Sequence, residues 1–279
     1  MCPGITDEQS RLLASWLGTF SVVGDYSWPL QDTAVLHVAT PRGDEFVIKA
    51  STTSHHIRRE IAAHGVGFEG LTGRVPLLRH ASAEAGILVT EFLRGTLVEG
   101  TPAEDAPETY RQAGELLQKI HRPAGVSGHY AEALRAKTHS WMKRAHGLVP
   151  EGQIGSLARE LEALEPGAVE LVTTHGDYQP RNGLQENGQV KVIDFGRADK
   201  RPWVHDLVRL SHQQFVGRPE LEAAFYDGYA RTVGAREADL WRLEHLNQAI
   251  GTVVWANQVG DAAFEQAGRT MLERVLSGP

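Results

Sequence analysis

The sequence is poor in cysteine and in long apolar runs. Its 279 residues include a single cysteine, Cys2, which excludes an internal disulfide and a zinc site of four thiolates. This favours a reducing compartment, so we expect a cytoplasmic protein. No window approaches the roughly 18 uninterrupted apolar residues that a membrane-spanning helix needs. The first residues show no basic segment leading into an apolar one. We therefore expect neither a secretion signal nor a membrane anchor.

Positive charge is also scarce. The chain has 28 Lys and Arg against 35 Asp and Glu, which gives a net charge of -7 at pH 7 and a pI near 6.0. Because phosphate binding draws on clustered Lys and Arg, we expect no nucleic-acid partner. An acidic protein suits cationic ligands, although a charge that only maintains solubility is the favoured interpretation.

Strand-like segments are concentrated in the first third of the chain. Thr6 and Gln9 form a capping box for a helix that ends at Gly18. Ser54 can cap a second helix, and the apolar run GILVTEFLRG follows it. Three short apolar segments between these helices predict an antiparallel meander, and they span residues 19–26, 34–40 and 45–51.

The rest of the chain is mostly helical, with long amphipathic segments and no internal repeat. We therefore predict an α+β fold of two lobes. A small antiparallel-sheet lobe, residues 1–93, is followed by a larger helical lobe, residues 94–279.

The segment HGDYQPRN interrupts two apolar runs, AVELVT and VKVIDFG, with a cluster of polar side chains. Asn182 follows Asp177 by five positions, and Asp194 closes the second run within Asp-Phe-Gly. This set supplies what phosphoryl transfer requires. One carboxylate can accept the proton of an attacking hydroxyl, and an amide oxygen with a second carboxylate can hold magnesium.

The turn QENGQ joins the two strands of this motif, and its length decides which face each metal ligand occupies. A two-residue loop of Asn187 and Gly188 would put Asp194 on the face opposite Asn182. A three-residue loop that begins at Glu186, with Gly188 left-handed in a bulge, would put both ligands on one face. We predict the bulged loop, because one metal ion has to reach both side chains.

HGDYQPRN together with VIDFGRADKRPWVHDL resembles the aminoglycoside phosphotransferase and choline kinase group, relatives of the protein kinases. The resemblance extends over most of the chain. It implies a protein-kinase-like fold with ATP between a nucleotide-binding lobe and a catalytic and substrate-binding lobe. It also implies Asp177 as the catalytic base, Asn182 and Asp194 as magnesium ligands, and Asp206 as a structural acid that supports the catalytic loop. We interpret His175 as a residue that orients this loop.

The resemblance also assigns nucleotide contacts. Lys49 ends the third strand in FVIKA, as the lysine that contacts the α- and β-phosphates does in these families. Glu60 on the following helix is its natural ion-pair partner. LVTEFLRG resembles the interlobe hinge, so the backbone of Glu91, Phe92 and Leu93 would bind adenine.

The sequence departs from the protein-kinase pattern in three places. No G-x-G-x-x-G stands between the first two strands, and within GDYSWPLQDT we propose Ser27 and Thr33 as phosphate contacts. Gln179 occupies the place of the catalytic-loop lysine, which leaves Arg181 to neutralise the transferred phosphate. Only nine residues separate Gly196 from Asp206. This is too short for a peptide-binding platform, so we expect a small-molecule acceptor.

The helix expected at residues 236–258 presents aromatic and polar side chains, including Trp255, at helical spacing. A core role is the favoured interpretation, with a wall of the substrate site as the alternative. Asp261 and Glu265 follow this helix and are candidates to meet ammonium groups of the acceptor. Surface solvation is the alternative, and it is favoured.

We therefore expect an ATP- and Mg2+-dependent O-phosphotransferase that acts on a hydroxyl of a small cationic molecule. The resemblance favours an antibiotic, either an aminoglycoside or a capreomycin-type cyclic peptide, so that the enzyme would confer resistance. The alternatives are a small-metabolite kinase for choline, a sugar or an amino alcohol, and a catalytically silent nucleotide-binding module. We expect a monomer or homodimer.

Overall fold

The computed structural model describes residues 4–28 and 32–278, so Cys2 and part of the loop GDYSWPLQDT lie outside the described residues. The chain forms two compact units. Unit 1 contains the chain up to Ile120, His175–Asp199 and Asp227–Ala230, and unit 2 contains His121–Thr174, Lys200–Tyr226 and the chain from Arg231 onward. The predicted lobe boundary at residue 93 concerns functional lobes and stays a prediction.

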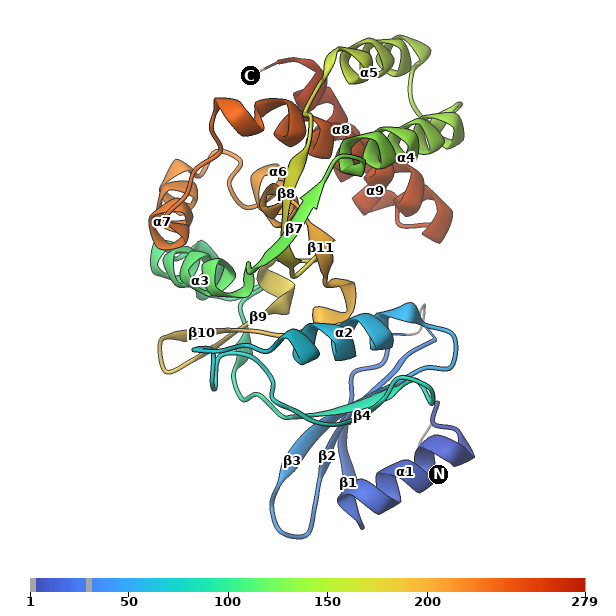
Figure 1. Ribbon diagram of the computed structural model, residues 1–279, viewed down its shortest axis with the longest axis vertical. Helices are drawn as coiled ribbons and strands as arrows, with labels where there is room; N and C mark the ends of the chain where they lie inside the picture. Colours follow the sequence, from blue (N-terminus) through green and yellow to red (C-terminus); the bar gives the residue numbers. More distant parts are fainter. Residues whose placement is uncertain (1–3, 29–31, 279) are drawn as a thin grey trace. The chain divides into compact units, whose positions relative to one another are not determined.

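Unit 1 contains a five-stranded antiparallel sheet in the order β1-β2-β3-β5-β4 (Figure 1). Its strands are β1 (Ser21–Asp25), β2 (Ala34–Ala39), β3 (Glu45–Ala50), β4 (Leu78–Ser82) and β5 (Ile87–Glu91). The predicted meander of the first three strands is confirmed. The edge strand β4, with sequence LRHAS, was not predicted because it shows no apolar alternation.

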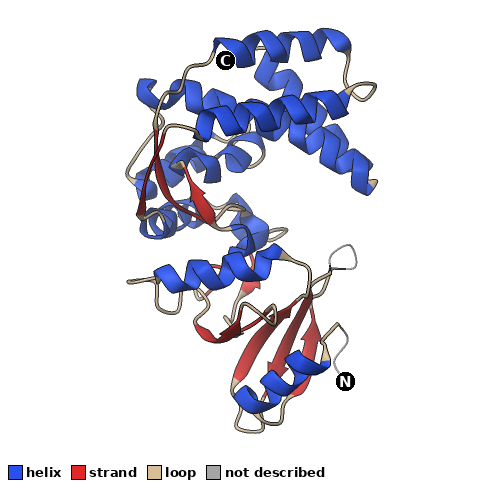
Figure 2. Cartoon of the chain, turned by 45° about the vertical axis from the view of Figure 1, so that its right-hand side comes forward, coloured by secondary structure: helices blue, strands red, loops and turns tan. Residues whose placement is uncertain are grey.

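The helix α1 (Asp7–Leu17) covers one face of this sheet (Figure 2), and its predicted capping box is confirmed. Leu36, Ile48 and Val89 lie opposite one another on adjacent strands, and their side chains are fully buried. They join Leu13 of α1 in an apolar cluster. Because side chains alternate along a strand, the neighbouring Lys49 points to the other face.

The helix α2 (His55–Val66) begins at Ser54, whose side chain accepts a hydrogen bond from the amide of His56. This satisfies one of the amide groups that a helix leaves unpaired at its start. The helix packs against β4, β5 and the short helix η3 (Phe195–Arg197). It thereby brings Glu60 to the same part of unit 1 as Asp194.

A smaller sheet of unit 1 has the order β10-β9-β6 and contains β6 (Thr96–Leu97), β9 (Gly183–Glu186) and β10 (Gln189–Val192). The predicted bulged loop is wrong. Gln189 pairs with Glu186, so the turn has two residues, and Asn187 and Gly188 both have positive φ, 50° and 76°. This is the pattern of a type I′ turn, which matches the twist of the flanking strands.

The helix α3 (Pro107–Ile120) also belongs to unit 1 and lies against the end of α7 (Pro219–Tyr229). A Cβ atom on Gly228 of α7 would lie 1.9 Å from the carbonyl oxygen of Arg111 in α3. Only glycine allows the two backbones to come this close.

Unit 2 is mainly helical, as predicted. Its helices include α4 (Tyr130–Ala145), α5 (Glu151–Ala163), α6 (Val208–His212), α8 (Ala238–Val259) and α9 (Ala262–Leu276). The helices α4 and α9 both pack on α8, and the core is formed by aliphatic side chains. A three-stranded sheet contains β7 (Pro123–Ser127), β8 (Val169–Thr174) and β11 (Asp199–Arg201).

Short 3-10 helices complete the fold, at Pro102–Asp105, Pro180–Asn182, Phe195–Arg197, Trp203–Asp206 and Ala235–Glu237. The segment Trp203–Asp206, labelled η4, packs against β8 and α8. Within the described part of the chain, no helix combines the length and the apolar character required to cross a membrane.

Candidate active site

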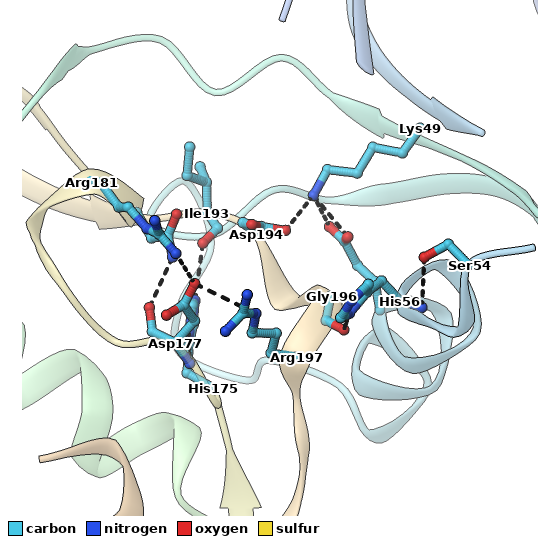
Figure 3. A network of polar contacts seen from close by, with 12 residues as sticks. Lys49, Ser54, His56, His175, Asp177, Arg181, Ile193, Asp194, Gly196 and Arg197 are labelled. Carbon is cyan, nitrogen blue, oxygen red and sulfur yellow. Dashed lines mark hydrogen bonds and ion pairs between the residues drawn. The ribbon is translucent and has the colours of Figure 1, made fainter. Parts of the chain in front are cut away.

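Unit 1 brings Lys49 into contact with two acids from different elements (Figure 3). The Nζ atom of Lys49 lies 3.0 and 2.8 Å from the two carboxylate oxygens of Glu60 in α2 and 2.8 Å from Oδ1 of Asp194. The predicted ion pair between Lys49 and Glu60 is therefore present. Their contact with a nucleotide stays a prediction.

The charges of this cluster are strongly coupled. Burial by itself would lower the pKa of Lys49, but the carboxylates of Asp194 and Glu60 outweigh it and raise that pKa. Burial and the nearby Asp194 raise the pKa of Glu60, although Lys49 acts in the other direction. The Lys49 ammonium holds the pKa of Asp194 well below its usual range, so Asp194 carries a firm negative charge.

The backbone of Asp194 leaves the strand and adopts a left-handed conformation, with φ 68° and ψ 72°. The alternation rule behind our loop prediction assumes extended backbone, so it does not decide where this side chain points. Residues other than glycine rarely adopt this backbone conformation, and those that do cluster at functional sites. The side chain of Asp194 is 47% exposed even with one oxygen bound to Lys49.

The chemistry of Asn182 and Asp194 fits a magnesium ion. The side-chain amide of Asn182 donates to the carbonyl oxygen of Asp177 at 2.8 Å, so the side-chain oxygen is the atom that a cation would contact. Asp194 contributes carboxylate oxygens. Both are hard oxygen ligands of the kind that magnesium prefers. Their service as metal ligands stays a prediction.

The carboxylate of Asp177 is buried, with 3% of the residue exposed, and it accepts hydrogen bonds from two nearby side chains. Gln179 Nε2 lies 2.5 Å from Oδ1, and Arg181 Nη2 lies 2.7 Å from Oδ2. The Nε atom of Arg197 lies 3.9 Å from the same Oδ2 (Figure 3). A buried carboxylate would be costly without such partners.

Arg197 was not predicted from the sequence. It follows the Asp-Phe-Gly segment directly, and its approach to Asp177 depends on the turn η3. The available signal was Gln179, which stands where the protein-kinase pattern has a lysine. The positive charge of that lysine would then have to come from another residue. Arg181 and Arg197 both place a guanidinium group next to Asp177.

His175 links the loop that contains Asp177 to Ile193, the residue that follows β10. Its Nε2 lies 2.9 Å from the carbonyl oxygen of Ile193, and its Nδ1 lies 3.3 Å from the amide nitrogen of Asp177. Since the amide is a donor, these contacts assign the proton to Nε2. The ring also packs on Phe195 at a centroid distance of 4.8 Å. These contacts are consistent with the predicted orienting role.

The predicted adenine contacts lie at the end of β5 in unit 1. The amide of Glu91 donates to the carbonyl of Leu77, and the amide of Phe92 donates to that of Glu45. These two amides are therefore used within the fold. The adenine contact at Glu91, Phe92 and Leu93 stays a prediction. It would use backbone groups of this segment other than these two amides.

The predicted phosphate contacts flank the loop between β1 and β2. Ser27 Oγ accepts from the amide of Val35 at 2.9 Å, and the amide of Ser27 donates to Asp25 at 2.9 Å. Ser27 thus holds the start of the loop in place. Thr33 is half-buried near its end. Contacts of Ser27 and Thr33 with phosphate stay predictions.

The other predicted residues lie in unit 2. Asp261 caps α9 by accepting from the amide of Phe264 at 2.9 Å. Glu265 is ion-paired with Arg269, and Trp255 packs edge-on against Phe264. These carboxylates already have local partners, so their role in acceptor binding stays a prediction.

Asp206 is also in unit 2. Its Oδ2 lies 2.9 Å from Nε2 of His121, and both side chains are buried. Support of the catalytic loop by Asp206 stays a prediction.

Comparison with protein families identifies one model that matches most of the chain. The model describes the phosphotransferase enzyme family and matches residues 32–244. No curated protein sequence matches.

Several solved structures share the fold at low sequence identity. They include a thermostable mutant of the aminoglycoside phosphotransferase APH(4)-Ia in ternary complex with ADP and hygromycin B, with a TM-score of 0.67 and 12% identity over 96% of this chain and 97% of that chain. The GDP and kanamycin complex of APH(2")-IIia has a TM-score of 0.68 and 13% identity over 98% and 99%. The macrolide 2'-phosphotransferase MphH from Brachybacterium faecium has a TM-score of 0.62 and 18% identity over 96% and 98%.

Proposed function

The chain belongs to the phosphotransferase enzyme family, and from this premise we propose that it moves the γ-phosphoryl group of ATP to a hydroxyl of a small cationic antibiotic. The observation that carries this proposal is the placement of Asp177 and the Lys49–Glu60–Asp194 cluster within one unit. Phosphoryl transfer needs charge and position rather than covalent chemistry from the protein, and this arrangement supplies both.

Lys49 would bind the nucleotide phosphates, with its ammonium held in place by Glu60. The Nζ atom of Lys49 lies 2.8 Å from Oδ1 of Asp194. Phosphate oxygens would compete with this carboxylate for the ammonium group. Asn182 and Asp194 would hold magnesium, which when bound neutralises charge across the phosphates. The high pKa of Lys49 keeps the ammonium protonated throughout.

Asp177 would orient the acceptor hydroxyl and accept its proton as the phosphoryl group moves in line. Holding the two reactants in this geometry can lower the barrier by about 7 to 11 kcal/mol. Arg181 lies on the same carboxylate and would neutralise the transferred group in place of the missing lysine.

The choice of an antibiotic acceptor is supported by the net charge of -7 and by the relatives that share the fold. Hygromycin B and kanamycin are the ligands named for two of them, with ADP and GDP as the nucleotides. The macrolide 2'-phosphotransferase widens the panel of acceptors that should be tried.

An assay of nucleotide turnover by the purified protein checks the proposal. The assay contains Mg2+ and ATP or GTP, and the acceptors tested are aminoglycosides, capreomycin-type peptides, macrolides, choline and sugars. We expect antibiotic-dependent ADP release, and expression of the gene should raise resistance to the same compound. Turnover with a metabolite but with no antibiotic would show that the acceptor is a metabolite. Nucleotide binding without any turnover would contradict the proposal.

The role of Asp177 has its own test. We expect Asp177→Asn to reduce kcat by a factor of at least about 1,000, because the neutral amide can neither accept the proton nor orient the hydroxyl. ATP affinity should change less than about threefold, since Asp177 acts on the acceptor. The exposed Asp44→Asn is the matched control and should leave kcat unchanged. A comparable transfer rate in Asp177→Asn would show that the assignment is wrong.

A further inference from the structure

A histidine in the first turn of α2 contacts the segment that follows Asp194 (Figure 3). The Nδ1 atom of His56 lies 2.7 Å from the carbonyl oxygen of Gly196. Because a carbonyl oxygen only accepts hydrogen bonds, the ring donates its proton from Nδ1. The mechanism proposed above gives this contact no role, and both residues belong to unit 1.

His56 is itself held in place by the fold. Its backbone amide donates to the side chain of Ser54 at 3.1 Å, so the residue belongs to the capped start of the helix. The residue is half-buried, and its ring packs on that of His55 at a centroid distance of 4.4 Å. A side chain that is already confined in this way loses little conformational freedom when it binds Gly196.

Gly196 connects His56 to the carboxylate of Asp194. The Lys49 ammonium and a hydrogen bond from the backbone amide of Gly196 both lower the pKa of Asp194. The carbonyl group of the same glycine accepts from His56. A Cβ atom on Gly196 would lie 3.3 Å from Oδ1 of Asp194 and 3.3 Å from Cβ of His56, which is closer than ordinary contact. Any larger residue at this position would therefore have to displace one of these side chains.

The helix α2 holds the segment 194–196 through two of its side chains. Glu60 follows His56 by four positions, so both lie on the same face of the helix. Glu60 binds Lys49, whose Nζ lies 2.8 Å from Oδ1 of Asp194, and His56 binds Gly196. The left-handed backbone of Asp194 is unfavourable for a residue other than glycine. Such a conformation persists only where the surrounding contacts enforce it.

We propose that His56 is a positioning residue that holds Asp194, through Gly196, in the conformation in which Asp194 binds magnesium. This proposal rests on the phosphotransferase function proposed above. Loss of the hydrogen bond would let the backbone of Asp194 relax, and its carboxylate would no longer be held in one place. Replacement of a residue that orients a metal ligand commonly lowers metal affinity about 10- to 100-fold. The metal affinity of the site would therefore depend on the position of α2.

ATP binding in the absence of any acceptor tests this role. Calorimetry gives the Kd of ATP with saturating Mg2+ and with EDTA, and the ratio of the two values is the effect of the metal. We expect His56→Leu, which keeps a bulky side chain but removes the donor, to reduce this ratio about 10-fold or more. The Kd in EDTA should change less than about threefold, because the contact of Lys49 with Glu60 does not involve His56. His56→Asn keeps a side-chain donor and should lose less.

Two further variants separate positioning from a general loss of structure. In an Asp194→Asn background, His56→Leu should not reduce the effect of the metal any further, because both changes act through the same carboxylate. His55→Asn removes the ring beside His56 but not the bond to Gly196, so it should keep the wild-type ratio. A lower Tm of His56→Leu without a lower ratio would show a purely structural role and overturn the proposal.

The same measurements distinguish this inference from the proposed function. If Mg2+ strengthens ATP binding equally in the wild type and in His56→Leu, this inference alone is wrong. If the wild type binds ATP equally well with Mg2+ and with EDTA, the metal role of Asp194 in the proposed function fails, and this inference falls with it. If the wild type binds ATP with Mg2+ but transfers phosphate to no acceptor, the proposed function fails. A reduced metal effect in His56→Leu would still support the positioning role in that case.

Discussion

At the level of single residues, two arginine side chains approach the carboxylate of Asp177. Arg181 donates to one of its oxygens at 2.7 Å, and Arg197 approaches the same oxygen. A lysine would be a mobile point charge, whereas a guanidinium group offers a rigid fork that matches phosphate geometry. We infer that the two arginines bind the transferred phosphoryl group during the reaction.

This inference predicts separate losses for the two arginines. Arg181→Ala should lower kcat on the order of 100-fold, as removal of a preorganised charge-stabilising donor does in other enzymes. Arg197→Ala should lower kcat about 10-fold, because its contact of 3.9 Å is longer. Arg181→Lys should restore only part of the rate, since lysine lacks the fork.

The measurement is kcat under saturating nucleotide and acceptor. Arg59→Ala removes a half-buried arginine of the same unit, paired with Asp199 at 3.4 Å, and should leave kcat unchanged. Full activity in Arg181→Ala would contradict the proposed binding of the transferred phosphoryl group by Arg181.

The sequence was informative where its motifs resemble those of a known family. The resemblance pairs Lys49 at the end of a strand with Glu60 on the next helix, and this ion pair is present. The role of Arg197 could not be predicted, because its contact with Asp177 depends on the left-handed backbone at Asp194. Motif spacing carries no information about such a change of chain direction.

At the level of secondary structure, the hairpin of β9 and β10 depends on its two-residue turn. Asn187 and Gly188 both have positive φ, and a Cβ on Gly188 would meet no atom within 4 Å. A substitution there therefore tests backbone strain without steric clash. The turn also fixes the register in which Ile193 donates to the carbonyl of Asn182.

We expect Gly188→Ala to lower the free energy of unfolding by about 1 kcal/mol, because alanine is strained in the left-handed region. Gly152→Ala in α5 is the matched comparison, since that position is helical and equally open. It should raise the free energy of unfolding by up to about 1 kcal/mol. Denaturant unfolding of both variants should therefore show shifts of opposite sign, and equal shifts would contradict this account.

The same hairpin shows where pattern reasoning about elements failed. Apolar alternation was sufficient for β2 and β3, whose paired residues are buried on one face. The loop prediction extended that alternation through Asp194. The strand ends at Val192, so the requirement that both predicted metal ligands share a face gave the wrong turn.

At the level of the whole molecule, each unit contains a histidine with a strongly lowered pKa. Burial lowers the pKa of His64 in unit 1 to about 4, and it lowers the pKa of His212 in unit 2 to about 4. The Nε2 atom of each is buried without a hydrogen-bond partner in the described structure. Both histidines are therefore neutral in the folded protein at pH 7.

This predicts lower stability in mild acid. Between the ordinary histidine pKa of 6.5 and the folded value of about 4, the unfolded chain binds protons that the folded chain does not. Stability is therefore complete above pH 6.5 and falls as the pH is lowered toward 4, on the order of 2 to 3 kcal/mol per histidine.

Denaturant unfolding at several pH values measures this slope, which is the change in the free energy of unfolding with pH. The double variant His64→Leu and His212→Leu should lose much of it, whereas the exposed His129→Leu should keep it. An unchanged slope in the double variant would exclude these two histidines as its source.

The order of sheet and helices was predicted from the sequence because composition changes along the chain. The interleaving of the two units was not, since it depends on contacts between segments far apart in sequence. Unit 1 gains residues 175–199 and 227–230 from regions that we assigned to the helical lobe. The motif HGDYQPRN marks the start of residues 175–199, but no local pattern says to which unit either segment belongs.

This interleaving has a consequence for synthesis on the ribosome. Three segments of unit 1 alternate with three of unit 2, so the chain passes between the units five times. The five-stranded sheet is complete once Glu91 has emerged, but unit 1 also requires Gly228, whose close contact with α3 comes late in translation. Domains normally fold in the order of their synthesis. Here Lys49 of the sheet can meet Glu60 early, but it can meet Asp194 only after most of the protein has been synthesised.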